Sequence, residues 1–184
     1  MRFNDIFCRS ENFKTALEAS RARLYRMAYA WTHNRALADD LVQETLAKAW
    51  QKREQLRDPK AQDAWLFSIL TNCFRDCHRR QRDTEDIDDM EIAGELCIET
   101  EQMRSELVGR VRTAIGRLPD GQRQVVSLVD LEGFSYVEVA SILSIPSGTV
   151  MSRLCRARAA LRTLLLAEMS ATSSPPGTRI RRIK

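Results

Sequence analysis

The residues best suited to specific chemistry lie in SGTVMSRLCRARAALR, residues 147–162. Val150, Leu154 and Ala157 recur at helical spacing and predict one buried stripe. Small hydroxyl groups stand outside this stripe in the first turns, and arginines follow them. Such a helix suits a DNA major groove, where short side chains reach base edges and arginines hold phosphates. A helical hairpin with a solvated basic face has the same pattern, so this stretch leaves both interpretations open.

The segment before this helix completes a helix-turn-helix pattern. Ser135 is placed to cap a helix that starts at the next residue, and Glu138 completes a capping box. Val137 and Ala140 give this helix apolar positions at helical spacing. Pro146 then ends it, because proline disfavours helical geometry in the residue that precedes it.

No other cluster of residues indicates catalysis or metal binding. Cys73, Cys77 and His78 have a hint of ligand spacing, but the histidine points about 100° away from the shared cysteine face and no fourth ligand is evident. We interpret the cysteines as buried or half-buried free thiols. The chain shows no clustered carboxylates, activated nucleophile or glycine-rich phosphate loop, so we expect neither an enzyme nor a cofactor.

The charge is divided into three blocks along the 184 residues. Residues 1–82 carry 16 basic and 10 acidic side chains, residues 83–101 carry 9 acidic and no basic ones, and residues 102–184 carry 13 basic and 6 acidic ones. This pattern predicts two basic modules joined by an acidic linker, and basic modules point to nucleic acid. Neither a signal peptide nor a long apolar run is evident, so we expect a cytoplasmic protein without membrane insertion.

The elements that must position these residues are helices, since no convincing alternating strand pattern occurs. We expect helices over about residues 13–32, 36–52 and 63–82, then over 102–117 and 121–132, followed by the helix-turn-helix up to residue 167. Residues 1–10 and the tail after 167 are expected to be poorly ordered. The positions expected to face a core include Trp31, Trp50, Val108, Leu131 and Val137.

Two stretches resemble the extracytoplasmic-function (ECF) group of bacterial sigma factors. ADDLVQETLAKAW, residues 38–50, and DAWLFSILTNCFRDCHRR, residues 63–80, resemble region 2 of that group. LPDGQRQVVSLVDLEGFSYVEVASILSIPSGTVMSRLCRARAAL, residues 118–161, resembles region 4. The resemblance implies an all-α protein of two small helical domains. The domain over residues 10–82 would resemble region 2, residues 83–101 would be a flexible linker, residues 102–167 would form the region 4-like domain, and 168–184 a basic tail.

The resemblance also implies the function of a promoter-specificity subunit of RNA polymerase. The surface for core RNA polymerase would comprise Asp39, Asp40, Gln43, Glu44 and Lys48. The surface for the −10 element, with an extruded base of the non-template strand, would comprise Asp58, Lys60, Gln62, Trp65, Phe67, Arg75, Arg79 and Arg80. The surface for the −35 element as duplex would comprise Ser147, Thr149, Met151, Ser152, Arg153, Cys155 and Arg156. An anti-sigma factor is expected as a further partner.

The chain departs from the family pattern on the groove side of the recognition helix. Many family members carry a basic residue at the position of Met151 and a larger side chain at that of Cys155. The loss of a cation removes a potential contact to guanine or phosphate, so the −35 preference of relatives does not transfer. Trp65 has two interpretations, as a stacking surface for a base or as part of the core.

Three other functions compete with the sigma factor. A conventional helix-turn-helix regulator would bind operator duplex as a dimer, but residues 10–82 show neither a ligand pocket signature nor a heptad seam. A stable monomer that binds core polymerase would exclude it. Against a nucleic-acid enzyme, the sequence shows no recognisable active site. A redox sensor using Cys73 and Cys77 would require that the activity of the protein depend on reductant.

Overall fold

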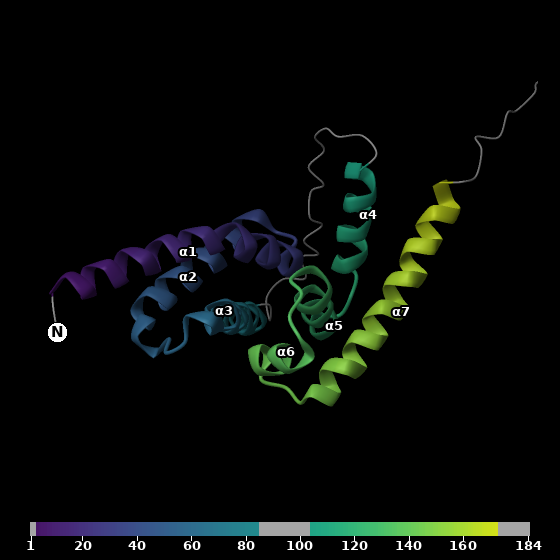
Figure 1. Cartoon of the computed structure of the whole chain (residues 1–184). Coiled ribbons are helices and arrows are strands. Elements are labelled where there is room, and N and C mark those ends of the chain that lie inside the picture. The colour runs from purple at the N-terminus through teal and green to yellow at the C-terminus, as the bar shows by residue number, and fades with distance from the viewer. Residues whose placement is uncertain (1–2, 85–103, 173–184) are drawn as a thin grey trace, which may run out of the picture.

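The described part of the chain is entirely helical and forms two packed modules (Figure 1). The computed structural model describes residues 3–84 and 104–172, and the side chains of 11–80 and 108–167. The first module contains α1 (Phe3–Thr32), α2 (Arg35–Gln51) and α3 (Gln62–Thr84), with short 3-10 turns η1 (Arg53–Gln55) and η2 (Pro59–Ala61) before α3. The second contains α4 (Arg104–Gly116), α5 (Asp120–Val126), the π turn η3 (Ser127–Leu131), α6 (Tyr136–Leu143) and α7 (Ser147–Thr172).

The first module is held together by the apolar faces of its three long helices. Each face repeats at helical spacing, so the three faces meet in one core. The core residues are Leu24, Met27, Ala28 and Trp31 of α1, Leu41, Val42 and Ala49 of α2, and Leu66, Leu70 and Cys73 of α3. Burial of each large apolar side chain contributes about 1.5–3 kcal/mol, so this packing dominates the stability of the module.

A sharp break separates α1 from α2, as the sequence predicts. His33 has a φ of 50°, in the left-handed region that ends helices. The side chain of Asn34 then accepts a hydrogen bond of 3.0 Å from the backbone N–H of Leu37 and caps α2. The chain therefore reverses direction within two residues and brings α2 alongside α1 (Figure 1).

The predicted helix-turn-helix is confirmed in its local detail. Ser135 Oγ accepts from the backbone N–H of Glu138 at 3.3 Å, and the carboxylate of Glu138 accepts from the backbone N–H of Ser135 at 2.8 Å. Ser144 ends α6 in a left-handed conformation, with a φ of 52°. The backbone N–H of Thr149 donates to the carbonyl of Pro146 at 2.9 Å and starts α7. Capping at both ends thus fixes the turn between α6 and α7.

Several predicted boundaries are wrong. The first helix begins at Phe3 and not near residue 13, and the last helix ends at Thr172 and not near 167. No proline or glycine interrupts either extension, so nothing in the sequence stops the helix there. Residues 83 and 84, assigned to the linker, belong to α3. The rest of the predicted linker, 85–101, and residues 173–184 of the tail lie outside the described residues.

Four residues predicted to face the core are exposed. The exposed fraction is 38% for Trp50, 42% for Val108, 55% for Leu131 and 75% for Val137. Leu131 closes the π turn η3, where the extra residue per turn rotates it away from the α-helical face. Val137 lies on the side of α6 opposite the buried Val139. Periodicity alone therefore misplaced residues where the helix changes its pitch or where only a short helix carries the pattern.

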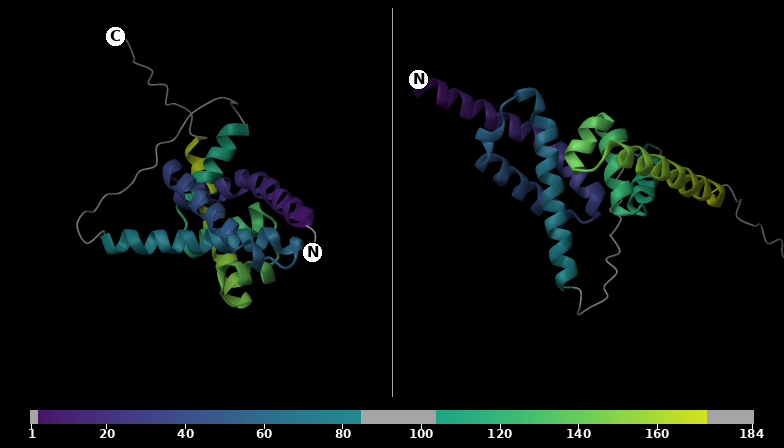
Figure 2. Two further views of the ribbon diagram at one scale, coloured as in Figure 1. Left: turned by 90° about the vertical axis from the view of Figure 1, so that its left-hand side faces the viewer. Right: turned by 90° about the horizontal axis from the view of Figure 1, so that it is seen from below.

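The two modules pack against each other, which the sequence analysis did not anticipate. α6 lies against α3, and α4 and α5 lie against α1 (Figure 2). Buried residues of both modules form one continuous hydrophobic cluster. Phe67 of α3 meets Phe134, just before α6, edge to face with ring centroids 5.1 Å apart. The cores of the two modules are therefore in direct contact.

The capping box yields a prediction about stability. Removing the cap with Ser135→Ala should lower the free energy of unfolding by about 1 kcal/mol at pH 7. Hydrogen bonds from Ser135 lower the pKa of Glu138 below its ordinary value of 4.5, so the capped state gains stability above that pH and loses it as the pH falls through the lowered pKa. Urea unfolding followed by circular dichroism measures both effects.

Ser141→Ala is the matched control for this prediction, since Ser141 is exposed on the same helix. We expect the control to unfold like the wild-type protein at every pH. A Ser135→Ala effect that stays constant from pH 7 to pH 3 would contradict the role of the Glu138 carboxylate.

Candidate protein and nucleic-acid interfaces

The α2 residues predicted to contact a protein partner form one acidic face. Asp39, Asp40 and Gln43 are exposed, whereas Glu44 and Lys48 are half-buried. Lys48 Nζ lies 2.8 Å from a carboxylate oxygen of Glu44, and this hydrogen bond raises the pKa of the lysine. The pair partly neutralises the C-terminal half of the face, so the open negative charge is concentrated at Asp39 and Asp40.

Ion pairs connect this face to the end of α3. Lys48 Nζ lies 3.9 Å from a carboxylate oxygen of Asp76, and Arg80 lies 3.8 Å from Glu44. Arg79 is 3.4 Å from Asp76. Exposed pairs of this kind contribute little to stability, about 0–1 kcal/mol each. They nevertheless place the C-terminal arginines of α3 beside the acidic face of α2.

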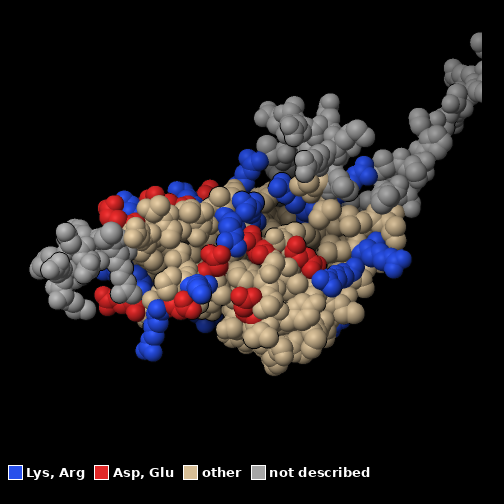
Figure 3. Space-filling model, viewed as in Figure 1, with Lys and Arg blue, Asp and Glu red and all other residues tan. Residues whose placement is uncertain are grey.

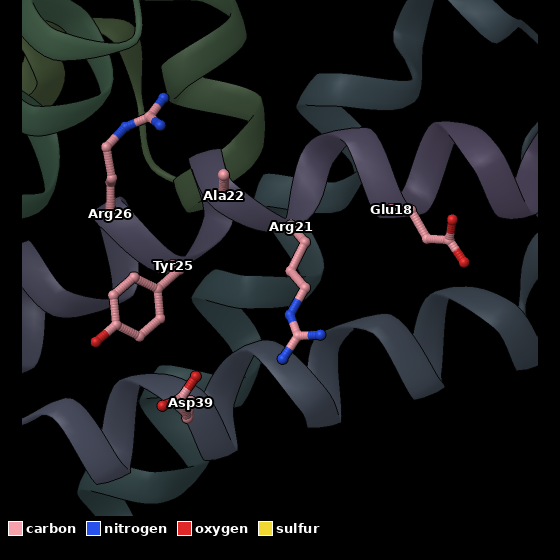
Figure 4. A pocket seen from close by; sticks show the side chains of 6 residues that line it. All are labelled: Glu18, Arg21, Ala22, Tyr25, Arg26 and Asp39. Carbon is pink, nitrogen blue, oxygen red and sulfur yellow. The ribbon is translucent and has the colours of Figure 1, made fainter.

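A shallow groove of about 500 Å³ opens between α1 and α2 (Figure 4). Arg21 and Tyr25 reach from α1 toward α2, where Asp39 stands at the edge of the groove. Acidic and basic side chains are interspersed over the outer face of α1 and α2 (Figure 3). The groove is therefore an open depression beside the acidic residues of α2 and not an enclosed pocket.

In the loop before α3, hydrogen bonding mainly holds the shape of the backbone turn. Asp58 accepts a hydrogen bond of 2.9 Å from the backbone N–H of Lys60 and caps η2. Lys60 is exposed, and Gln62 is half-buried as the first residue of α3. The three predicted loop residues are thus brought together, with the carboxylate of Asp58 engaged in holding the turn.

The two aromatic residues predicted to stack on a base differ in exposure. Trp65 is half-buried, and its ring centroid lies 6.4 Å from that of Phe13. Phe67 is only 2% exposed, and its ring contacts Phe134 of the second module and the guanidinium of Arg23. In this arrangement Phe67 has no open face on which a base could stack.

The α3 arginines also differ in what they contact. Arg75 donates a short hydrogen bond to the backbone carbonyl of Leu143 at the end of α6. Arg79 and Arg80 are exposed at the C-terminal end of α3. The second module therefore contacts the middle of the predicted −10 surface and leaves both of its ends exposed.

The first turns of α7 present an open surface. Ser147, Met151, Ser152, Cys155 and Arg156 are exposed, while Thr149 and Arg153 are half-buried. On the face seen in Figure 3, the end of the module at which α6 meets α7 is largely uncharged. All seven residues predicted for duplex DNA therefore share the N-terminal half of one helix.

Two other arginines of α7 have structural partners. Arg158 forms a two-point ion pair with Asp130 of η3 at 2.6 and 3.1 Å, which raises the pKa of the guanidinium. Arg153 lies against Gly121, where an added Cβ would stand 3.0 Å from Arg153 Nη1. These contacts hold α7 against α5 and η3, so they orient the exposed residues of its first turns.

The three cysteines whose side chains the structure describes differ in burial. Cys73 is buried, Cys77 is half-buried and Cys155 is exposed. Burial raises the pKa of the thiols of Cys73 and Cys77. Over residues 3–84 and 104–172, no three His, Cys, Asp or Glu side chains are arranged to hold a metal ion. None of the described helices is long and apolar enough to cross a bilayer.

Comparison with known proteins identifies the family. Residues 17–84 match the family Sigma-70 region 2, and residues 109–161 match Sigma-70, region 4. The ECF RNA polymerase sigma factor EcfG of Rhodopseudomonas palustris is 34% identical over 170 residues, which cover 92% of this chain and 93% of that protein. This chain belongs to the ECF RNA polymerase sigma factors. The sigma factor CnrH of Cupriavidus metallidurans is 33% identical over 141 residues, covering 71% and 74% of the two chains.

Solved structures extend the similarity to three dimensions. The sigma factor RpoE of Bartonella quintana, solved with the anti-sigma factor NepR, has a TM-score of 0.76 at 34% identity and covers 85% of this chain and 98% of that one. CnrH, solved with the cytosolic domain of CnrY, has a TM-score of 0.61 at 30% identity and covers 84% and 88%. The family resemblance and the two-domain helical fold expected from the sequence are confirmed. The sigma factor joins core RNA polymerase and directs it to promoters, and the dimeric operator-binding regulator is not favoured.

The residues that join the two modules were missed by the sequence analysis. They include Arg23 of α1 and Arg123 of α5, to which the sequence analysis assigned no role. Glu132 and Phe134 complete the set on the second module. Single residues of this kind belong to no repeating pattern in the sequence, so only the three-dimensional arrangement shows that they join the modules.

Thiol reactivity provides a test of this site description. Because the thiolate is the reactive species, burial and a raised pKa should make Cys73 and Cys77 slow to alkylate, whereas exposed Cys155 should react first. Timed alkylation of the native protein at pH 7.5 (roughly one unit below the ordinary thiol pKa), followed by peptide mass spectrometry, measures each site separately. Equal rates at Cys73 and Cys155 would contradict the burial of Cys73, and urea should abolish the difference.

Proposed function

We propose that this ECF sigma factor divides its work among three surfaces. The exposed acids of α2 bind core polymerase, the loop before α3 and α3 itself bind the −10 element, and the first turns of α7 bind the −35 element. The strongest support for this division comes from α7, the second helix of a capped helix-turn-helix, whose hydroxyl and arginine side chains are open to solvent in its first turns. The corresponding domains are residues 10–82 and 102–167, joined by the acidic segment 83–101.

The acidic face of α2 suits a basic protein partner. Asp39 and Asp40 are exposed and adjacent, whereas Lys48 is already paired with Glu44. Complementary charge speeds association and selects the partner more than it raises affinity. We therefore assign the polymerase contact to Asp39, Asp40, Gln43, Glu44 and Lys48, with the two aspartates as its centre.

The −35 contact uses the exposed side of α7. Ser147, Thr149 and Ser152 stand at the end that enters a major groove, and Arg153 and Arg156 follow within two turns. Met151 and Cys155 lie between them and offer apolar contact in place of a cation, for example to a thymine methyl group. We infer a −35 preference that differs from that of relatives with a basic residue at this position.

The −10 contact combines an aromatic surface with cations. Trp65 and Phe67 lie at the start of α3, after the turn that Asp58 caps. Lys60 and Gln62 flank them, and Arg75, Arg79 and Arg80 continue along α3 as a track for the phosphate backbone. A flipped base gains about 1–3 kcal/mol from stacking on an aromatic ring, so this combination suits an unpaired strand.

Regulation by an anti-sigma factor is the third part of the proposal. Both solved relatives were captured with anti-sigma proteins, NepR and the cytosolic domain of CnrY. We infer that a protein of this kind controls the present chain. A sigma factor has no chemistry of its own, so we assign no enzymatic activity, and its work on polymerase and promoter places it in the cytoplasm.

Run-off transcription with purified core polymerase tests the polymerase contact. We expect the wild-type protein to produce discrete transcripts from genomic fragments and Asp39→Arg to abolish them, because the reversed charge repels a basic partner. Glu11→Arg is the matched control, with the same change in charge at an exposed position of α1. Transcription by Asp39→Arg at the wild-type level would exclude this assignment.

Promoter binding by the holoenzyme tests the α7 contact. Arg156→Ala should weaken promoter binding about tenfold or more, since a specific arginine contact is worth about 1–3 kcal/mol. A filter-binding titration at several salt concentrations separates the two kinds of contact. A phosphate contact lowers the salt slope by about 1 and affects all promoters equally, whereas a base contact affects only some sequences.

Arg162→Ala is the control for the α7 contact, since Arg162 is exposed nearly two turns further along the same helix. We expect this variant to bind promoters like the wild-type holoenzyme. If Arg156→Ala also binds like wild type on every promoter, α7 does not contact the −35 element through this residue.

A further inference from the structure

The open side of the recognition helix carries two neighbouring sulfur side chains. Met151 is 52% exposed, and Cys155, four residues further along α7, is exposed as well. Side chains at this spacing are neighbours on one face of a helix, with Cβ atoms about 5–6 Å apart. We call these two residues the apolar pair. Neither of them carries a charge or a strong hydrogen-bonding group, so their contact with a ligand is mainly apolar.

The helix before the turn adds further exposed apolar surface. Tyr136 and Val137, in the first turn of α6, are 40% and 75% exposed. On the face seen in Figure 3, the end of the module at which α6 meets α7 shows hardly any charge. Single exposed apolar residues are normal on a soluble protein, whereas several of them on two adjoining helices indicate a site of interaction.

The arginines around the apolar pair are largely directed to other partners. Arg153 is half-buried against the first turn of α5, where a Cβ added to Gly121 would stand 3.0 Å from Arg153 Nη1. Arg158 is held at 2.6 and 3.1 Å by the carboxylate of Asp130. Arg156 is exposed and lies one residue beyond the apolar pair. Cationic contacts to base edges from the first two turns of α7 are therefore few.

The hydroxyl groups of these turns are also partly engaged. Ser152 Oγ donates a hydrogen bond of 3.1 Å to the backbone carbonyl of Thr149, which is itself half-buried. In this arrangement the proton of Ser152 is used within the helix, and its oxygen is left to accept. Discrimination of bases by hydrogen bonds needs donors and acceptors aimed at the base edges. The apolar pair thus provides a different kind of readout on this face.

The major groove offers one apolar group to such a pair. Thymine presents its C5-methyl group there, whereas an arginine would select the acceptors of guanine. 5-Methylcytosine carries the same methyl group at the same ring position. Successive bases of one strand lie about 3.4 Å apart along the helix axis, so the spacing of the two Cβ atoms corresponds to one or two base-pair steps. The pair therefore fits methyl groups on nearby pyrimidines.

We propose that this sigma factor reads its −35 element through C5-methyl groups of pyrimidines, which contact Met151 and Cys155. The inference rests on the proposed −35 contact of α7. Neither side chain has a strong donor or acceptor that would tell the O4 of thymine from the N4 amino group of cytosine. Thymine and 5-methylcytosine are therefore equivalent at the apolar pair, and unmethylated cytosine binds less tightly. Methylation of cytosine within the −35 element strengthens binding of the holoenzyme.

Replacement of thymine by deoxyuridine tests the proposal, because it removes the methyl group and keeps the base pair. Each −35 thymine, on either strand of a promoter found by run-off transcription, is replaced in turn. Competition filter binding then measures the affinity of the holoenzyme. We expect about fourfold weaker binding at one or two positions, the effect of one methyl group that is no longer buried. Deoxyuridine in the spacer between the −35 and −10 elements is the control and should have no effect.

Variants of α7 assign each methyl contact to a residue. In Met151→Ala, deoxyuridine at the position that faces Met151 should no longer weaken binding, because the two partners of one contact are not additive. Cys155→Ala should do the same at the other position. Leu166→Ala is the matched control, since Leu166 is 53% exposed far beyond the first turns of the same helix. This control should keep the full deoxyuridine effect, and circular dichroism confirms that each variant folds.

A gain of a methyl group complements its loss. Where a sensitive position is changed to cytosine, its replacement by 5-methylcytosine should tighten binding about fourfold, again the effect of one buried methyl group.

The outcomes separate this inference from the proposed function. Core-dependent transcription with affinity that is indifferent to every −35 methyl group would refute methyl readout and leave the sigma function intact. A −35 element without any A·T pair would refute it in the same way. A deoxyuridine effect that persists undiminished in both Met151→Ala and Cys155→Ala would refute the assignment to the apolar pair. Absence of core-dependent transcription would refute the proposed function itself.

Discussion

The guanidinium of Arg123 joins the end of α1 in the first module to the end of α4 in the second. Its side chain is 15% exposed, and it donates to carbonyls at the ends of α1 and α4 that the helices leave unsatisfied. Burial lowers the pKa of Arg123, which shows that the surroundings oppose the charge that these carbonyls stabilise. Loss of the arginine would leave the carbonyl of Trp31 facing a gap in the interface. This residue therefore stabilises the placement of the second module on the first, together with the contact of Phe67 and Phe134 and the ion pair of Arg23 and Glu132.

Packing of the two modules covers the three proposed surfaces unequally. The proposed −10 surface lies partly under α6, whereas the residues proposed to contact the polymerase and the −35 element are largely exposed. The facing surfaces of Phe67 and Phe134 are buried against each other, so the proposed base contact at Phe67 needs this pair to part.

Local signals in the sequence were sufficient to predict the number and order of the long helices, although not all of their ends. The capping box of Ser135 and Glu138 and the break at Asn34 follow from hydrogen bonds between near neighbours, and the structure contains both. Contacts between modules could not be predicted, because Arg23 and Glu132 are 109 residues apart and each resembles an ordinary surface charge. The exposure of Leu131 could not be predicted for a different reason. The spacing of apolar residues in the sequence does not show that a π turn is present.

The recognition helix separates the residues that fold it from the residues that can read DNA. Val150, Leu154 and Ala157 are buried and hold α7 in the module, whereas Met151 and Cys155 on its open side pack against nothing essential. Substitution of Met151 or Cys155 should therefore change the free energy of unfolding very little. Under the proposed −35 contact, single amino-acid replacements on this side can therefore change promoter preference while the buried residues that hold the helix stay the same.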